Sequence, residues 1–195
     1  MIRRAALALA LLTACSPGAA NPRPAVDARC AGRGATAMEI DGDARPDLVF
    51  HDQNEDNDTI LGACLGDGTY VQTEGYGMGE LLNAFDVDGD GREEVLAGGT
   101  TATYAEYVVL RYANGDLVET GLTLRSGIAP AAAFGCDANG LVQVDVDRAT
   151  GVVRTTHPTL AGPGPAVETR LPRGADASDY ASSLVTPCAG LRERS

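Results

Sequence analysis

The sequence predicts an all-β domain built from three copies of one unit of about 48 residues, after an N-terminal targeting segment. An acidic pattern occurs three times, and its third-position residues, Asp41, Asp88 and Asp137, are 47 and 49 residues apart. A turn-forming triplet follows each of these aspartates by 25 to 27 residues. A Val-x-Thr triplet follows each by 30 residues, in the same register. Helical periodicity is absent beyond the targeting segment.

Residues 1–14 are predicted to be a signal peptide that is not part of the fold. Arg3 and Arg4 give it a positive start, and the apolar run at 5–12 is too short to span a bilayer. The run ends in Leu-Thr-Ala-Cys, which resembles the lipobox of bacterial lipoproteins. The resemblance implies cleavage before Cys15 and a diacylglyceryl group on its sulfur, so that the protein is anchored to the membrane on its extracytoplasmic side. The alternative is an ordinary secretory signal with a chance cysteine.

Residues 15–29 are rich in Pro and Ala and are expected to form a flexible tether ahead of the repeat domain at 30–195. An even number of cysteines in an exported domain predicts two disulfides. Of the three possible pairings we favour the one in which each bond closes one end of the domain. Zinc binding is disfavoured because no Cys-x-x-Cys pair is present. The favoured bonds are Cys30–Cys64 and Cys136–Cys188.

The net charge of −12 becomes about −14 once Arg3 and Arg4 leave with the signal peptide, and the chain has no lysine. Nucleic acids and anionic lipid surfaces are recognised by basic patches, which this composition does not supply. The charge therefore argues against both as partners.

The acidic pattern at 86–94 predicts a calcium-binding loop. Carboxylates occupy its positions 1, 3, 5 and 9, position 7 offers a backbone carbonyl, and calcium takes six to eight oxygen ligands. An EF-hand is excluded because position 12 is Ala97 and a strand, not a helix, is expected to follow. The candidate ligands are Asp86, Asp88, Asp90, Arg92 through its carbonyl, and Glu94.

A second loop of this kind is predicted at 39–47, with candidate ligands Glu39, Asp41, Asp43, Arg45 through its carbonyl, and Asp47. The third copy, at 135–143, has Gly135 at position 1 and Gln143 at position 9. Its remaining Asp137 and Asn139 carry too little charge to hold calcium well. We therefore expect two calcium ions and a degenerate third loop.

These loops resemble those of FG-GAP and VCBS repeats, the units of integrin alpha-chain propellers, in which Asp-x-Asp-x-Asp-Gly-x-x-Asp precedes a hydrophobic strand. The resemblance implies three blade units in a small or partial β-propeller. Three units are too few for a conventional ring. The chain ends could form a further partial blade, the units could form a compact cluster, or an open fragment could pair with a partner. Strands are expected at 81–85, 94–96, 106–112, 116–122 and 131–134.

The resemblance also implies a non-enzymatic binding, adhesion or scaffold module with a protein or glycan ligand. The alternatives are a subunit of a cell-envelope hydrolase and a purely structural envelope protein. No Gly-x-Ser-x-Gly motif is present, and Ser182 and Ser183 have no neighbouring histidine. His51 precedes an acidic segment at 53–58 that is expected to be a solvated loop, although it could hold another cation. We assign no role to His157.

Overall fold

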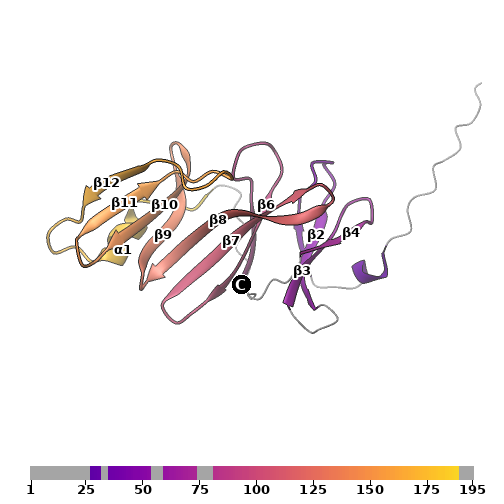
Figure 1. The fold of residues 1–195 in the computed structure, drawn as a ribbon, viewed down its shortest axis with the longest axis horizontal. Coiled ribbons are helices and arrows are strands. Elements are labelled where there is room, and N and C mark those ends of the chain that lie inside the picture. Colours follow the sequence, from indigo (N-terminus) through magenta and orange to yellow (C-terminus); the bar gives the residue numbers. More distant parts are fainter. Residues whose placement is uncertain (1–26, 32–34, 54–58, 74–80, 189–195) are drawn as a thin grey trace, which may run out of the picture.

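Two antiparallel sheets make up the fold in this computed structural model, which describes residues 27–31, 35–53, 59–73 and 81–188 (Figure 1). The signal peptide, Cys15 and most of the tether lie outside the described residues, as does most of the acidic segment at 53–58. Among the described residues, no helix has the length and apolar character needed to cross a membrane.

The first sheet has four strands that pair in the order in which they occur in the chain. Its strands are β1 (Thr36–Met38), β2 (Asp47–Gln53), β3 (Thr59–Cys64) and β4 (Tyr70–Gln72). Met38 pairs with Asp47, so the first acidic loop directly connects the neighbouring strands β1 and β2.

The second sheet has eight strands, and each again pairs with its neighbours in sequence. Such a meander follows from short connections, because hairpins produce antiparallel neighbours. The strands are β5 (Leu81–Phe85), β6 (Glu94–Thr100), β7 (Tyr104–Ala113), β8 (Asp116–Ile128), β9 (Ala131–Asp137), β10 (Gly140–Asp147), β11 (Val152–Thr156) and β12 (Ala166–Arg170). Strands β8 and β9 pair only at Gly127–Ala132 and Ile128–Ala131, so two groups of four strands meet at a short seam.

All five expected strands are confirmed, and most extend further than expected. The all-β class is also confirmed. Neither sheet closes on itself, however. The propeller-like arrangement therefore stays a prediction.

One buried cluster of apolar side chains includes residues from both sheets, so the sheets share a core. Burial of apolar surface at this junction stabilises the packing of one sheet on the other by roughly 25 cal/mol per Å². The first sheet and its loop contribute Met38, Ile40, Val49, Leu61, Ala63, Leu65 and Val71, and the second contributes Ala84, Val95, Ala97, Leu110 and Leu117.

A helix that the sequence analysis did not predict, α1 (Ala177–Ser183), packs beside β9 and β10. Asp176 caps its first turn by accepting hydrogen bonds from the backbone N–H groups of Ser178 and Asp179. Ala177 and Ala181, one turn apart, are buried against the sheet. The cap and this spacing were the available signals, but seven residues are too few for periodicity alone to reveal a helix.

Both favoured disulfides are confirmed. Cys30 ends a short 3-10 helix, η1 (Ala28–Cys30), and bonds to Cys64 on β3. Cys136 on β9 bonds to Cys188, which follows α1. The bonds close segments of 34 and 52 residues, and each is expected to stabilise the fold by about 3–4 kcal/mol.

Candidate metal centre

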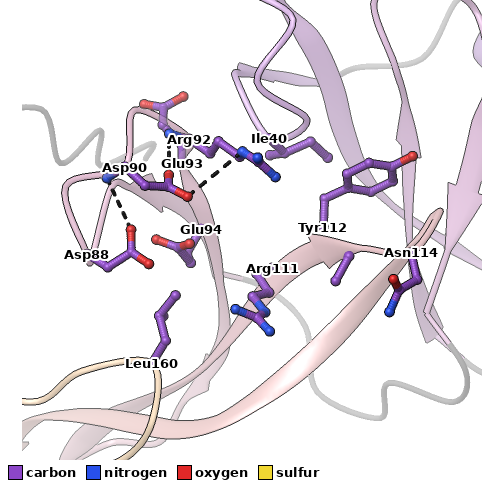
Figure 2. A pocket seen from close by; sticks show the side chains of 11 residues that line it. Ile40, Asp88, Asp90, Arg92, Glu93, Glu94, Arg111, Tyr112, Asn114 and Leu160 are labelled. Carbon is purple, nitrogen blue, oxygen red and sulfur yellow. Dashed lines mark hydrogen bonds and ion pairs between the residues drawn. The ribbon is translucent and has the colours of Figure 1, made fainter.

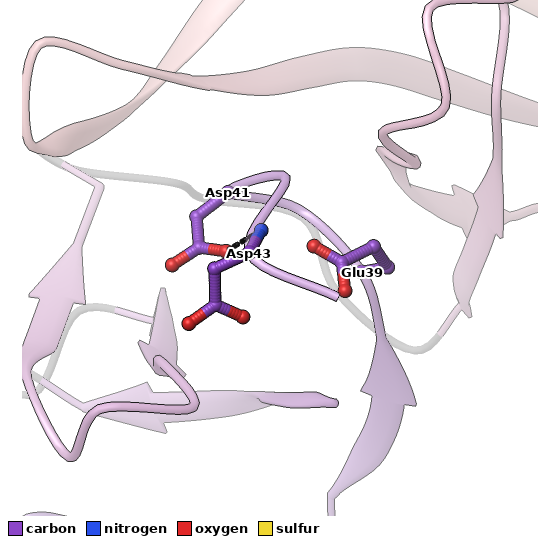
Figure 3. Close-up of side chains that lie close together, drawn as sticks. All are labelled: Glu39, Asp41 and Asp43. Atoms are coloured by element: carbon purple, nitrogen blue, oxygen red, sulfur yellow. Dashed lines mark hydrogen bonds between the residues drawn. The ribbon is translucent and has the colours of Figure 1, made fainter. Parts of the chain in front are cut away.

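The loop at 39–47, the first loop, gathers three carboxylates between β1 and β2 (Figure 3). One carboxylate oxygen from each of Glu39, Asp41 and Asp43 lies within 4.8 Å of the others, and we call these residues the first cluster. Hydrogen bonds from the loop backbone hold all three side chains in place. Glu39 accepts from Gly42 at 2.8 Å, Asp41 from Asp43 at 3.0 Å, and Asp43 from Arg45 at 2.8 Å.

Asp47 closes the first loop and is not part of the first cluster. Its side chain is completely buried, and it accepts hydrogen bonds from the backbone N–H groups of Ile40, at 2.8 Å, and Gly66, at 2.7 Å. Burial raises the pKa of this carboxyl group, and the two hydrogen bonds oppose that shift. Arg45 pairs with Asp43 at 2.7 Å, so its guanidinium neutralises part of the loop's charge.

The loop at 86–94, the second loop, lies between β5 and β6 and gathers Asp86, Asp88 and Glu94 in the same way. We call these three residues the second cluster. Asp86 accepts backbone hydrogen bonds from three residues further along the loop, at 2.7 to 3.1 Å. Asp90 lies outside the cluster and is 3.8 Å from the guanidinium of Arg92.

Glu94 is the buried member of the second cluster, with only 3 % of its surface exposed. It accepts a hydrogen bond from the N–H of Val87 at 2.8 Å. Burial, together with the neighbouring charges of Asp88, Asp90 and Asp86, raises the pKa of Glu94 to about 7, against the lowering effect of that hydrogen bond. A divalent cation would offset both the burial and the repulsion that make the charged form of Glu94 unfavourable.

The same pattern of internal hydrogen bonds recurs in both loops, and the two loops also contact each other. Position 9 accepts from the backbone at position 2 in both, as Asp47 from Ile40 and Glu94 from Val87. The N–H of Glu39 donates to the carboxylate of Glu93 at 2.9 Å, and the N–H of Glu93 donates to the carbonyl of Glu39 at 2.6 Å. Sequence reasoning missed Glu93, because nothing local marks a contact between two residues 54 positions apart.

The third loop forms part of a tight hairpin between β9 and β10 and gathers no carboxylate cluster in the described part of the chain. A side chain at Gly135 would place its Cβ 2.5 Å from the carbonyl oxygen of Thr186. Gln143 is buried, and its amide accepts from the N–H of Arg125 at 2.9 Å and donates to its carbonyl at 3.1 Å. Positions 1 and 9 of the third loop therefore serve packing and hydrogen bonding to other segments of the fold.

The two histidines have different surroundings. His157 lies 2.8 Å from the carboxylate of Asp137. The hydrogen bond from the N–H of Asn139, and after it the contact with His157, lower the pKa of Asp137. Burial lowers the pKa of His51 on β2, and neither of its ring nitrogens has a hydrogen-bond partner among the described residues. The neighbouring acidic residues at 54–58 lie outside those residues, so the expectation of a solvated loop there stays untested.

No family model, curated protein or solved structure matches this chain. The likeness to FG-GAP and VCBS repeats therefore rests on the loop residues themselves. What the geometry adds is that two of the three acidic patterns form compact carboxylate clusters, and that these lie on neighbouring loops.

Proposed function

We propose that this chain is a calcium-binding module without catalytic activity, built from three FG-GAP-like units and anchored through Cys15 to the extracytoplasmic face of a bacterial membrane. The observation that carries the proposal is the pair of carboxylate clusters on two loops with the same internal hydrogen bond. In this account the module is a scaffold that presents its surface to a protein or glycan ligand.

The donor set favours calcium among the common metals. Each cluster offers only carboxylate oxygens, which are hard ligands suited to calcium and magnesium. Calcium accepts six to eight oxygens in a flexible arrangement, whereas magnesium demands a near-ideal octahedron. The carbonyls of Arg45 and Arg92, together with water, would complete the irregular coordination that the three carboxylates of each loop begin.

The cation's role in this proposal is structural. Three carboxylates within 4.8 Å of one another repel until a cation neutralises them, at a cost of roughly 1–4 kcal/mol for each pair. The two loops contact each other at Glu39 and Glu93. Neutralising the carboxylates of the two clusters would therefore also stabilise the junction of the two sheets.

Titration calorimetry of two matched variants tests the proposal. Asp88→Ala removes the position-3 carboxylate of the second cluster, so it should reduce calcium stoichiometry from two equivalents to one. Asp137→Ala removes the position-3 carboxylate of the third loop and should leave two equivalents. Loss of an equivalent in Asp137→Ala, or its retention in Asp88→Ala, would show that our assignment of the loops is wrong.

A further inference from the structure

A cavity of about 290 Å³ lies between the second loop and the end of β7 (Figure 2). Asp88 and Glu94 of the second cluster line it, and Arg111 and Tyr112 of β7 line it from the other side. Figure 2 shows that Asp88, Glu94 and Arg111 surround the same space, with Leu160 beside it. The carboxylates assigned to the cation therefore also face a space large enough for a small molecule.

Arg111 is the distinctive residue of this cavity. It is exposed, and within the described residues its guanidinium makes no ion pair or hydrogen bond. The other arginine in the lining, Arg92, lies beside Asp90. A guanidinium offers a planar set of donors that matches a carboxylate in a bidentate arrangement.

Arg111 also borders a second cavity. This cavity, of about 370 Å³, is bordered by Leu160 as well and extends along β8 past Glu119 and Thr120. Leu160 gives both cavities an apolar wall, and the strands provide hydroxyl and carboxylate groups. A ligand with a compact ring and several oxygens suits such a lining.

The second cluster leaves coordination positions for such a ligand. It supplies three carboxylates, and Asp90 is held apart beside Arg92. A calcium ion that takes six to eight oxygens would still need several from elsewhere. Since Asp88 and Glu94 face the cavity, some of the remaining positions would face it as well.

We infer that this cavity binds a small hydroxy-carboxylate, the class that includes sugar acids, whose oxygens complete the coordination of calcium at the second cluster and whose carboxylate pairs with Arg111. The inference rests on the proposed calcium site. Without the cation, Asp88, Asp90, Glu93 and Glu94 surround the cavity with negative charge and would repel an anion. Binding of the ligand therefore depends on calcium.

The test uses galacturonate as the probe and galactose as its uncharged counterpart, titrated into the calcium-saturated protein by calorimetry. Galacturonate is expected to bind at least about tenfold more tightly than galactose, because it alone can pair with a guanidinium. A chelator should abolish its binding. Arg111→Gln should weaken it by about tenfold or more while two calcium equivalents are retained. Arg173→Gln, an exposed arginine outside both cavities, should bind as the wild type does.

The outcomes separate this inference from the proposed function. Two calcium equivalents combined with no preference for galacturonate over galactose would overturn the inference and leave the calcium module in place. Unchanged galacturonate binding in Arg111→Gln would overturn it too. Failure to bind calcium would overturn the proposed function and the inference together.

Discussion

Glu39 and Glu93 join the two sheets of this protein through reciprocal hydrogen bonds. The backbone N–H of Glu39 donates to the Glu93 carboxylate at 2.9 Å, and the backbone N–H of Glu93 donates to the Glu39 carbonyl at 2.6 Å. Glu39 also belongs to the first cluster, and Glu93 directly precedes Glu94 of the second. The contact therefore connects the two candidate cation sites as well as the two sheets.

Removing the Glu93 side chain should weaken both the junction and calcium binding. Glu93→Ala leaves the half-buried N–H of Glu39 without its acceptor, which should lower the free energy of unfolding by about 1–3 kcal/mol. Glu93→Gln retains an oxygen at that position and should lose less. Chemical denaturation of both variants measures the difference in the free energy of unfolding. Equal losses in the two variants would show that this hydrogen bond does not stabilise the junction.

The stability of the metal-free protein should fall as the pH rises through neutrality. The pKa of Glu94 is raised from 4.5 to about 7 in the folded state. A raised pKa contributes stability that is fully present below pH 4.5 and is lost as the pH passes 7. Calcium should reverse this trend, because it favours the charged carboxylate.

Melting curves of the chelator-treated wild type and of Glu94→Gln at pH 5 and pH 8 isolate this group from the other carboxyls. The wild type should lose more stability than the variant between the two pH values. An identical loss in both proteins would contradict the raised pKa of Glu94.

Gly98 on β6 should not tolerate a side chain. A Cβ at this position would lie 2.0 Å from the carbonyl oxygen of Glu106 on the paired strand β7. Gly98→Ala therefore forces the two backbones apart and should destabilise the fold by about 1–3 kcal/mol. Thr100→Ala, at an exposed position on the same strand, serves as the control in thermal unfolding and should change stability little.

Changing Cys15 tests the predicted lipid anchor. If the Leu-Thr-Ala-Cys sequence directs lipid attachment, Cys15→Ala should abolish metabolic labelling of the protein with a fatty acid. Cys188→Ala should retain the label, since that cysteine is bonded to Cys136. Labelled Cys15→Ala protein would show that the anchor prediction is wrong.

Local patterns were enough to predict five strands of the second sheet and the two acidic loops. Alternating β-branched and aromatic residues around Tyr107 and Val109 give β7, and carboxylates at every second position give the loops. That β5 to β12 form one continuous sheet could not be predicted, because β8 and β9 pair at only two positions and that contact depends on packing across the whole domain. The contact between Glu39 and Glu93 was hidden for the same reason.

The ligand sets were only partly predictable. Asp47 and Glu94 occupy the same loop position, yet Glu94 lies in its cluster and Asp47 does not. The shorter Asp47 side chain accepts hydrogen bonds from both Ile40 and Gly66, and this second partner comes from the turn between β3 and β4. Position in the motif predicts the carboxylate, but the neighbouring strands determine where it points.

Calorimetric titration of calcium into the chelator-treated protein, with a melting curve recorded at each end, is the most direct test of the central claim. We expect two equivalents and a higher melting temperature in calcium, since a ligand at a hundred times its Kd adds about 2.7 kcal/mol of stability per site. Absence of binding, or binding that leaves the melting temperature unchanged, would contradict a structural role for calcium at the junction of the two sheets.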